Sequence, residues 1–258
     1  MTAVTAFLNE LQLRNELLFW FGLGCLLFAL VLLGISYWDD TRVLGANAWY
    51  KPMKFALSTT MYSWAMAWFM FYLDKPGFTG FFSWAVILLL GFEILYITLQ
   101  AGRGELSHFN TSSALTSNMY SLMAFAATAV SLLTLWAGVE FFRGDFKALP
   151  DYYLWGIRCG IFLFVIFSLQ GFLMGSANGH TIGGEMGGEG LPFLNWSRLF
   201  GDLRIAHFVG MHALQIIPLL SFYLLKNTKL TLIFAALYGL LALSTLVQAL
   251  LGKPLIPG

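Results

Sequence analysis

The sequence predicts an all-α integral membrane protein in which seven transmembrane helices form one bundle. Only 10% of its 258 residues are charged and 59% are hydrophobic, whereas about a quarter of an ordinary soluble domain is charged. A transmembrane helix needs about 20 mainly apolar residues, and stretches of that kind fill the chain and leave no room for a soluble domain. We expect the spans at approximately 16–37, 53–73, 81–101, 118–142, 154–175, 205–225 and 230–252.

The first element is a short segment before the first span. Residues 1–15 carry apolar side chains at helical spacing, and Glu10 and Arg14 form an i,i+4 pair. The segment has neither the basic start nor the small-residue cleavage site of a signal peptide. We therefore expect an interfacial amphipathic helix at 1–15, followed by a single transmembrane domain at 16–253.

Residues that start and stop helices support this division. Asn15 can cap the first span, Pro52 suits the first turn of the second, and Asp202 can cap the sixth. Pro76 and Gly77 interrupt the chain between the second and third spans. These signals predict helix ends at the same places as the apolar stretches do.

The connections between spans alternate between two faces, which we name side A and side B. Side A holds the N-terminus and the connections 74–80, 143–153 and 226–229. Side B holds the C-terminus and the connections 38–52, 102–117 and 176–204.

Basic residues do not orient the bundle by number alone, because each side carries seven. On side B, however, Lys51, Lys54 and Arg204 lie at the starts of helices, where the helix dipole disfavours a cation. If these residues serve a site, they should be left out of the count. The prediction is then a cell (inner) membrane protein with a cytoplasmic N-terminus and with side B periplasmic or extracellular.

Polar residues inside the spans gather toward side B. All four histidines, His108, His180, His207 and His212, lie on side B or in the B half of a helix. At a rise of about 1.5 Å per residue, His212 and Glu93 both lie about 15 Å below side B, with Gln100 and His207 in a shallower tier. Two tiers of polar groups at one end of a bundle predict a pocket that opens to side B.

Helical spacing indicates which of these groups share a face. Glu93 and Gln100 are seven residues apart on the third span, and His212 and Gln215 are three apart on the sixth. His207 and His212 are five apart, about 140° around a regular helix, so they do not suit joint chelation of one metal. For Glu93 the partner we expect is His212, in either a functional pair or an interhelical hydrogen bond.

Two loops on side B stand out: one is rich in charged and imidazole side chains, and the other is rich in glycine. The segment 103–110 brings Arg103, Glu105 and His108 to the end of the third span. Seven glycines lie between Gly175 and Gly190, but not in a nucleotide-binding arrangement. These glycines favour either a lid with close backbone contacts or a flexible loop, and His180 within it is expected to be a solvated loop residue.

Three sequence blocks resemble a group of uncharacterised bacterial seven-helix membrane proteins. The blocks are KPMKFALS at 51–58, GHTIG at 179–183 and DLRIAHFVGMHALQ at 202–215. The resemblance implies a seven-helix bundle and implies no activity. Retinal proteins, membrane hydrolases with H-x-x-x-H near the end, and desaturases with histidine boxes do not fit, because the lysine or histidine patterns they need are absent from this sequence.

The first functional hypothesis is a membrane enzyme for an amphipathic or lipidic substrate that enters from side B. Glu93 and His212 would be its catalytic acid/base pair. A divalent metal would be held by His108, His207 and Glu105, and Gln215 would join the two histidines in binding a cofactor. The substrate's anionic head group would be held by Lys54, Arg103, Arg204 and Gln100.

Three alternatives stay open. One is a transporter or sensor that binds a small anionic or lipidic ligand with no chemistry. Another is a b-type haem or quinone protein, with His108, His207 and His212 as the available imidazoles. The last is a structural subunit. The expected partners are the lipid bilayer and a small amphipathic or anionic ligand, and a net charge of +1 gives no sign of nucleic acid binding.

Overall fold

The computed structural model describes residues 2–188 and 190–258, and the chain they trace is all-α apart from two small hairpins. The long helices are α2 (Glu16–Ile35), α3 (Tyr50–Met70), α4 (Pro76–Gly102), α5 (Ala114–Arg143), α6 (Asp151–Leu169) and α10 (Thr228–Leu250). The short ones are α1 (Ala3–Arg14), η1 (Phe71–Leu73), α7 (Gly171–Ser176), α8 (Leu203–Met211), α9 (Ala213–Leu220) and the π-helical η2 (Ser221–Leu225).

Six helical segments are long and apolar enough to cross a membrane. They are Glu16–Ile35, Pro76–Gly102, Ala114–Arg143, Asp151–Ser176, Leu203–Leu225 and Thr228–Leu250. The predicted membrane class is therefore confirmed, but the count of seven is not. The difference lies in α3, which has 21 residues but is less apolar than the other long helices.

The polar residues of α3 face other helices. Thr60 donates a hydrogen bond to the carbonyl of Ala56 one turn back and lies equally close to the carbonyl of Gly22 on α2, both at 3.0 Å. The Tyr62 hydroxyl lies 2.6 Å from the Thr134 hydroxyl on α5. Because buried polar groups are tolerated when they are hydrogen-bonded, α3 can be polar and still lie inside the bundle.

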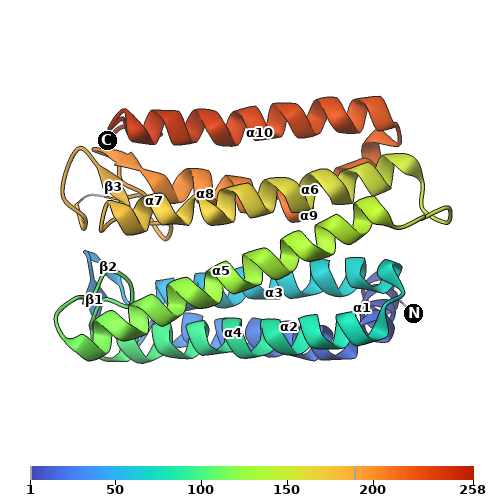
Figure 1. Ribbon diagram of the computed structural model, residues 1–258. Coiled ribbons are helices and arrows are strands. Elements are labelled where there is room, and N and C mark those ends of the chain that lie inside the picture. The colour runs from blue at the N-terminus through green and yellow to red at the C-terminus, as the bar shows by residue number, and fades with distance from the viewer. Residues whose placement is uncertain (1, 189) are drawn as a thin grey trace.

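The long helices form two groups with α5 running diagonally between them (Figure 1). One group contains α2, α3 and α4, and the other contains α6, α8, α9 and α10. Helix α5 packs against α4 in the first group and against α6 in the second. The N-terminus lies at one end of the bundle, side A, and the C-terminus and both hairpins lie at the other, side B (Figure 1).

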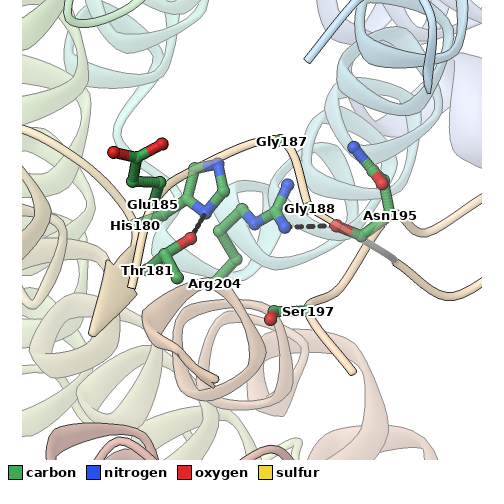
Figure 2. A pocket seen from close by; sticks show the side chains of 8 residues that line it. All are labelled: His180, Thr181, Glu185, Gly187, Gly188, Asn195, Ser197 and Arg204. Atoms are coloured by element: carbon green, nitrogen blue, oxygen red, sulfur yellow. Dashed lines mark hydrogen bonds between the residues drawn. The ribbon is translucent and has the colours of Figure 1, made fainter. Parts of the chain in front are cut away.

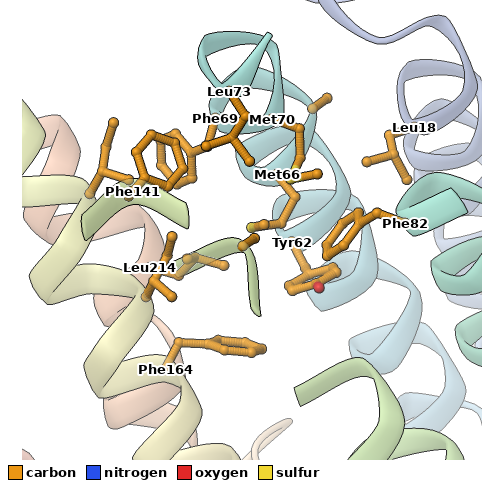
Figure 3. Close-up of a cluster of buried hydrophobic side chains, with 14 of the residues drawn as sticks. Leu18, Tyr62, Met66, Phe69, Met70, Leu73, Phe82, Phe141, Phe164 and Leu214 are labelled. Carbon is orange, nitrogen blue, oxygen red and sulfur yellow. The ribbon is translucent and has the colours of Figure 1, made fainter. Parts of the chain in front are cut away.

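The largest apolar cluster joins the two groups in the A half of the bundle (Figure 3). Tyr62 and Met66 of α3 meet Phe164 of α6 and Leu214 of α9, and the rings of Tyr62 and Phe164 stack at 5.3 Å. In a bilayer, where lipid tails are as apolar as these side chains, close packing rather than exclusion of water holds helices together. Gly160 permits such packing, because a Cβ there would lie 2.9 Å from the carbonyl oxygen of Ala213.

Several predicted local contacts are confirmed. The side chain of Asn15 caps α2 by accepting a hydrogen bond from the backbone N–H of Leu18 at 3.0 Å. Asp202 caps α8 by accepting one from the backbone N–H of Arg204 at 3.1 Å. The Glu10–Arg14 pair closes at 2.8 Å within α1.

The sixth predicted span is not one continuous helix, although its apolar pattern predicted one. His212 separates α8 from α9, and the segment ends in the π-helical η2. Pro218 lies inside α9, and proline has no N–H to continue the hydrogen-bond pattern of a helix. The stretch expected as one helix at 205–225 is therefore three consecutive pieces.

Two hairpins shape the side B surface. Strands β1 (Arg42–Val43) and β2 (Ala46–Asn47) form the first, and β3 (Thr181–Ile182) pairs with β4 (Gly201–Asp202) to form the second. The second pairing joins residues 181–182 to residues 201–202, so that the segment between them, which we call the glycine-rich loop, closes over the bundle. Gly201 is needed at that position, because a Cβ there would lie 2.0 Å from the carbonyl oxygen of Ala249 on α10.

Candidate functional site

The first turns of α3 carry two lysines that lie at the side B end of the bundle. The Nζ of Lys51 lies 3.2 Å from Nδ1 of His108, in the loop after α4. The Nζ of Lys54 donates hydrogen bonds to the backbone carbonyls of Phe193 and Leu194, at 2.9 and 3.1 Å. Both lysines therefore reach loops that are distant in sequence, and neither lies within ion-pair distance of a carboxylate in the described part of the chain.

Arg204 lies in the first turn of α8 and is held by Asp202. Its Nε donates to one carboxylate oxygen of Asp202 at 2.9 Å, and its NH2 donates to the other at 2.6 Å. The same NH2 also donates to the backbone carbonyl of Asn195. This two-point arrangement is the geometry that a planar guanidinium favours with a carboxylate, and it fixes Arg204 against the glycine-rich loop.

Asp202 is a compensated buried acid, with 1% of its surface exposed. Besides Arg204, the backbone N–H of Ser197 donates to its carboxylate at 2.9 Å. Burial acts to raise the pKa of Asp202, but the hydrogen bonds and charge of Arg204 outweigh it and hold the pKa below its ordinary value. Asp202 is thus ionised, and its charge is used by Arg204.

His180 lies beside this pair rather than in solvent. Its Nδ1 is 3.8 Å from a carboxylate oxygen of Asp202, and only 11% of its side chain is exposed. Burial and then the charge of Arg204 lower the pKa of His180 to about 4, against an opposing effect of Asp202. The expectation that His180 is a solvated loop residue is therefore wrong, because the β3–β4 pairing folds it inward.

His108 is also neutral. Burial, and then the charge of Lys51, hold the pKa of His108 well below its ordinary value. A neutral imidazole can accept a hydrogen bond at Nδ1, so the ammonium of Lys51 donates to it. Its ring is enclosed by the aromatic side chains of Phe55, Phe109 and Tyr120.

These residues form what we call the B-side site: Lys51, Lys54, His108, His180, Asp202 and Arg204. Arg204 lies within electrostatic range of both lysines. Three cations thus share a half-buried region in which, among the residues described, Asp202 is the one carboxylate that bonds to any of them. The site thus has three basic side chains and one acidic side chain among the described residues, and is suited to an anion.

A small cavity of about 10 Å³ adjoins the site, which is room for about one water molecule. Figure 2 shows its lining, in which His180 and Arg204 lie side by side. Thr181, Asn195 and Ser197 add polar groups, and the exposed Glu185 adds a carboxylate. The glycine-rich loop closes over it and is tied to three places: Lys54, Arg204 and, through a hydrogen bond from Asn195 of 3.4 Å, the carbonyl of Leu44.

Other predicted site residues lie apart from the B-side site or bond to each other. Gln100 donates from Nε2 to Glu105 at 3.2 Å and to the carbonyl of Leu106 at 3.1 Å. Arg103 and Glu105 are exposed. His207 uses Nδ1 for the carbonyl of Phe167 at 2.7 Å.

The expected pair of Glu93 and His212 is not formed. Glu93 is on α4, which packs against α2, α3 and α5, whereas His212 joins α8 and α9 in the other group of helices. His212 instead lies 3.3 Å from Oε1 of Gln215 and packs against Phe208. Counting residues from side B predicts how deep a side chain lies along its helix, but it does not specify which helices are neighbours.

The predicted metal ligands do not gather. Within residues 2–188 and 190–258, no three His, Cys, Asp or Glu side chains are grouped so that they could hold a metal ion. His108 and His207 lie within electrostatic range of each other, but Glu105 is bonded to Gln100.

Sequence reasoning left Lys51, His180 and Asp202 out of the site. For Asp202 the sequence does contain a signal: a helix-capping acid stands two residues before the cation Arg204. A capping acid can also bind such a cation. For Lys51, the signal is its position at the start of a helix, where the helix dipole disfavours a cation. In the sequence analysis that position bears only on the orientation of the bundle in the membrane.

Comparisons with known proteins return no relatives. No model of a known protein family matches the chain, and neither does any curated protein or solved structure. The function must therefore be argued from the site itself.

Proposed function

We propose that this is a membrane protein with seven spanning helices, in which α3 is the seventh. Its length of 21 residues is sufficient for a span. Its polar side chains are explained by burial, since Thr59, Thr60 and Ser63 are nearly inaccessible and a buried helix need not be apolar toward lipid. Residues 16–253 then form one domain preceded by the interfacial helix α1.

We further propose that the N-terminus is cytoplasmic and that side B faces the periplasm or the exterior. Lys51 and Arg204 bind groups of the B-side site, and Lys54 binds the loop over it, so they are explained without the positive-inside rule. Leaving them out gives four basic residues on side B against seven on side A. Labelling of single cysteines by a membrane-impermeant reagent in intact cells tests this: a cysteine at position 256 should react and one at 147 should not.

For activity, we propose that the B-side site binds a small anionic ligand, either free or as the head group of an amphipathic molecule, in a transporter or sensor. The observation that carries this proposal is that Lys51 and Lys54 are half-buried cations whose hydrogen-bond partners are an imidazole and backbone carbonyls. Buried charges are normally paired with opposite charges. An anion would supply the missing partner.

Binding would exchange weak contacts for stronger ones. Lys54 would give up two neutral carbonyl acceptors for a charged one, and charge-assisted hydrogen bonds are roughly twice as strong as neutral ones. Because the cavity holds only about 10 Å³, a phosphate-sized ligand requires residues 193–195 to move away from Lys54. The ligand-binding function is favoured over metal-dependent catalysis because the anion-binding groups gather and the predicted metal ligands do not.

Thermal unfolding of the purified protein in detergent tests the proposal. Two probes separate the sources of the anion: inorganic phosphate, and vesicles of phosphatidylglycerol compared with vesicles of phosphatidylcholine. Ligand at about 100 times its Kd stabilises a protein by about 2.7 kcal/mol, so a clear rise in unfolding temperature is expected with one anionic probe.

The variant Lys54→Gln should abolish that rise. Lys229→Gln is the matched control, because Lys229 is also in the first turn of a helix, α10, but is exposed on side A; it should respond like the parent protein. If Lys54→Gln responds as fully as Lys229→Gln, or if neither anionic probe stabilises the parent protein, the proposal is wrong.

A further inference from the structure

Three buried polar residues lie along one face of α4 outside the B-side site. Glu93, Tyr96 and Gln100 are three and four residues apart and span about 10 Å along the helix axis. Their exposed fractions are 6%, 9% and 0%. They therefore form a polar stripe inside the bundle, running from the middle of α4 to its side B end.

Each of these residues has one polar atom without a hydrogen-bond partner in the described protein. The atoms are Oε1 of Glu93, the hydroxyl oxygen of Tyr96 and Oε1 of Gln100. Buried polar atoms of this kind also occur elsewhere in the described protein, for example on Trp49, Ser63 and Thr231, so a single one carries little weight. Three on one face, within two helical turns, indicate that another molecule completes the hydrogen bonds, and the spacing along the helix suits bridging water.

The stripe reaches the surface on side B. Gln100 donates to Glu105 at 3.2 Å, and Glu105 is exposed at the end of α4. Tyr96 lies within electrostatic range of Glu105 and Arg103. The stripe is therefore connected to solvent at one end and terminates inside the bundle at Glu93.

No described charge compensates Glu93. The helices packed against α4 are α2, α3 and α5. Their titratable residues are Glu16 and Cys25 on α2, Tyr50, Lys51, Lys54 and Tyr62 on α3, and Tyr120, Glu140 and Arg143 on α5. None of these residues acts on the Glu93 carboxyl, and the Tyr62 hydroxyl is occupied by Thr134. A lone carboxylate inside a bilayer is costly, so the cation it most readily takes is a proton.

We propose that Glu93 is a proton-binding site that exchanges with side B through a hydrogen-bonded file of water past Tyr96 and Gln100 to Glu105. A proton delivered by hydronium at side B passes along the file and forms an O–H bond on the Glu93 carboxylate. Release reverses the same steps. The inference is independent of anion binding, because none of these residues belongs to the B-side site.

Infrared spectroscopy of the full chain reconstituted in lipid vesicles tests the proposal. A protonated carboxylic acid has a distinct carbonyl stretch that shifts when its proton is replaced by deuterium, and Glu93→Gln identifies the band that belongs to Glu93. In the parent protein this band should be present in neutral buffer, disappear in alkaline buffer, and shift promptly on transfer to D₂O.

Variants of the file should slow that exchange. Tyr96→Phe and Gln100→Leu are each expected to slow it about tenfold, which corresponds to about 1.4 kcal/mol on the barrier. Thr98→Val is the matched control, because Thr98 lies on a different face of the same helix and bonds to the carbonyl of Ile94; its exchange rate should match the parent.

Two results would overturn the inference. One is a carboxylic acid band that Glu93→Gln leaves unchanged at every pH. The other is exchange in Tyr96→Phe and Gln100→Leu that is as fast as in Thr98→Val. Tyr96→Phe retains the aromatic ring, so packing is preserved and a failure to fold does not obscure the result.

Discussion

The two ends of the bundle are joined by different chemistry. At side A, the two helix groups meet through a large apolar cluster, and Lys75 and Arg14 have the acids Glu140 and Glu10 as partners at 2.5 and 2.8 Å. At side B, they meet through polar loops, and two of the three cations of the B-side site have no acid as a partner among the described residues. Equal numbers of basic residues thus conceal different partners: Arg14, Lys75, Arg143 and Lys147 pair with acids on side A, whereas in the B-side site only Arg204 does so among the described residues.

This contrast teaches that placement, rather than number, distinguishes a stabilising cation from one available to a ligand. Arg14 lies over the ring of Trp68 at 3.9 Å as well as bonding to Glu10, so its charge has an acidic partner within the fold. Lys51 has an imidazole nitrogen at 3.2 Å instead. Four substitutions, taken from the largest expected effect to the smallest, test this difference.

Asp202→Ala should be the most damaging change. It removes the buried partner of Arg204 and the cap of α8, and leaving one member of a buried ion pair without its partner costs about 3–5 kcal/mol. Chemical denaturation in detergent would measure the loss. A loss below about 1 kcal/mol would mean that Arg204 is already solvated, contrary to its hydrogen bonds.

His180 should make stability depend on pH. Its pKa is about 4 in the folded protein and about 6.5 when unfolded, so between these values the unfolded state binds more protons. The stability that this group contributes is therefore complete above about pH 6.5 and is lost as pH falls toward about 4, by about 3 kcal/mol. His180→Gln should flatten this part of the denaturation profile, and an unchanged slope would contradict the buried position of His180.

Lys51→Met should change stability in the opposite direction from Asp202→Ala. It replaces an unpaired half-buried cation by an apolar side chain of similar length, and such replacements are neutral or stabilising, here by about 1 kcal/mol. Thermal unfolding without anions would measure the gain. A substantial loss of stability would show that the contact between Lys51 and His108 supports the fold rather than a ligand.

Lys147→Ala should change almost nothing. Lys147 pairs with Asp145 at 3.0 Å on side A, but the two side chains are 89% and 69% exposed, and such surface pairs contribute about 0–1 kcal/mol. Its unfolding midpoint should match the parent protein within error. A measurable loss would indicate that the A-side loop at 143–150 is more important to the fold than its exposure suggests.

The sequence was informative wherever local rules decide the structure. Apolar length predicted the helices closely, and Asn15 and Asp202 are the caps that their side chains suggested. His212 and Gln215 are neighbours because three residues of one helical turn separate them. These features depend on residues close in the chain.

The remaining features depend on the order in which helices pack, which no local pattern specifies. Glu93 and His212 match in depth but belong to different helix groups. His180 was expected in solvent because glycines surround it, yet the pairing of Thr181 with Asp202 turns it inward. Lys51 and Lys54 find their partners 57 and about 140 positions away in the chain, which spacing alone does not reveal.

The attachment of the glycine-rich loop has a mechanical consequence. The loop is tied through Phe193 and Leu194 to Lys54 on α3, through Asn195 to Leu44 beside α3, and again through Asn195 to Arg204 on α8. The loop therefore connects the two helix groups at side B, opposite the apolar cluster that joins them in the A half of the bundle (Figure 1). A pivot at side A would place its greatest displacement at side B, so rocking of one group against the other would strain the hydrogen bonds that join the loop to Lys54 and Arg204.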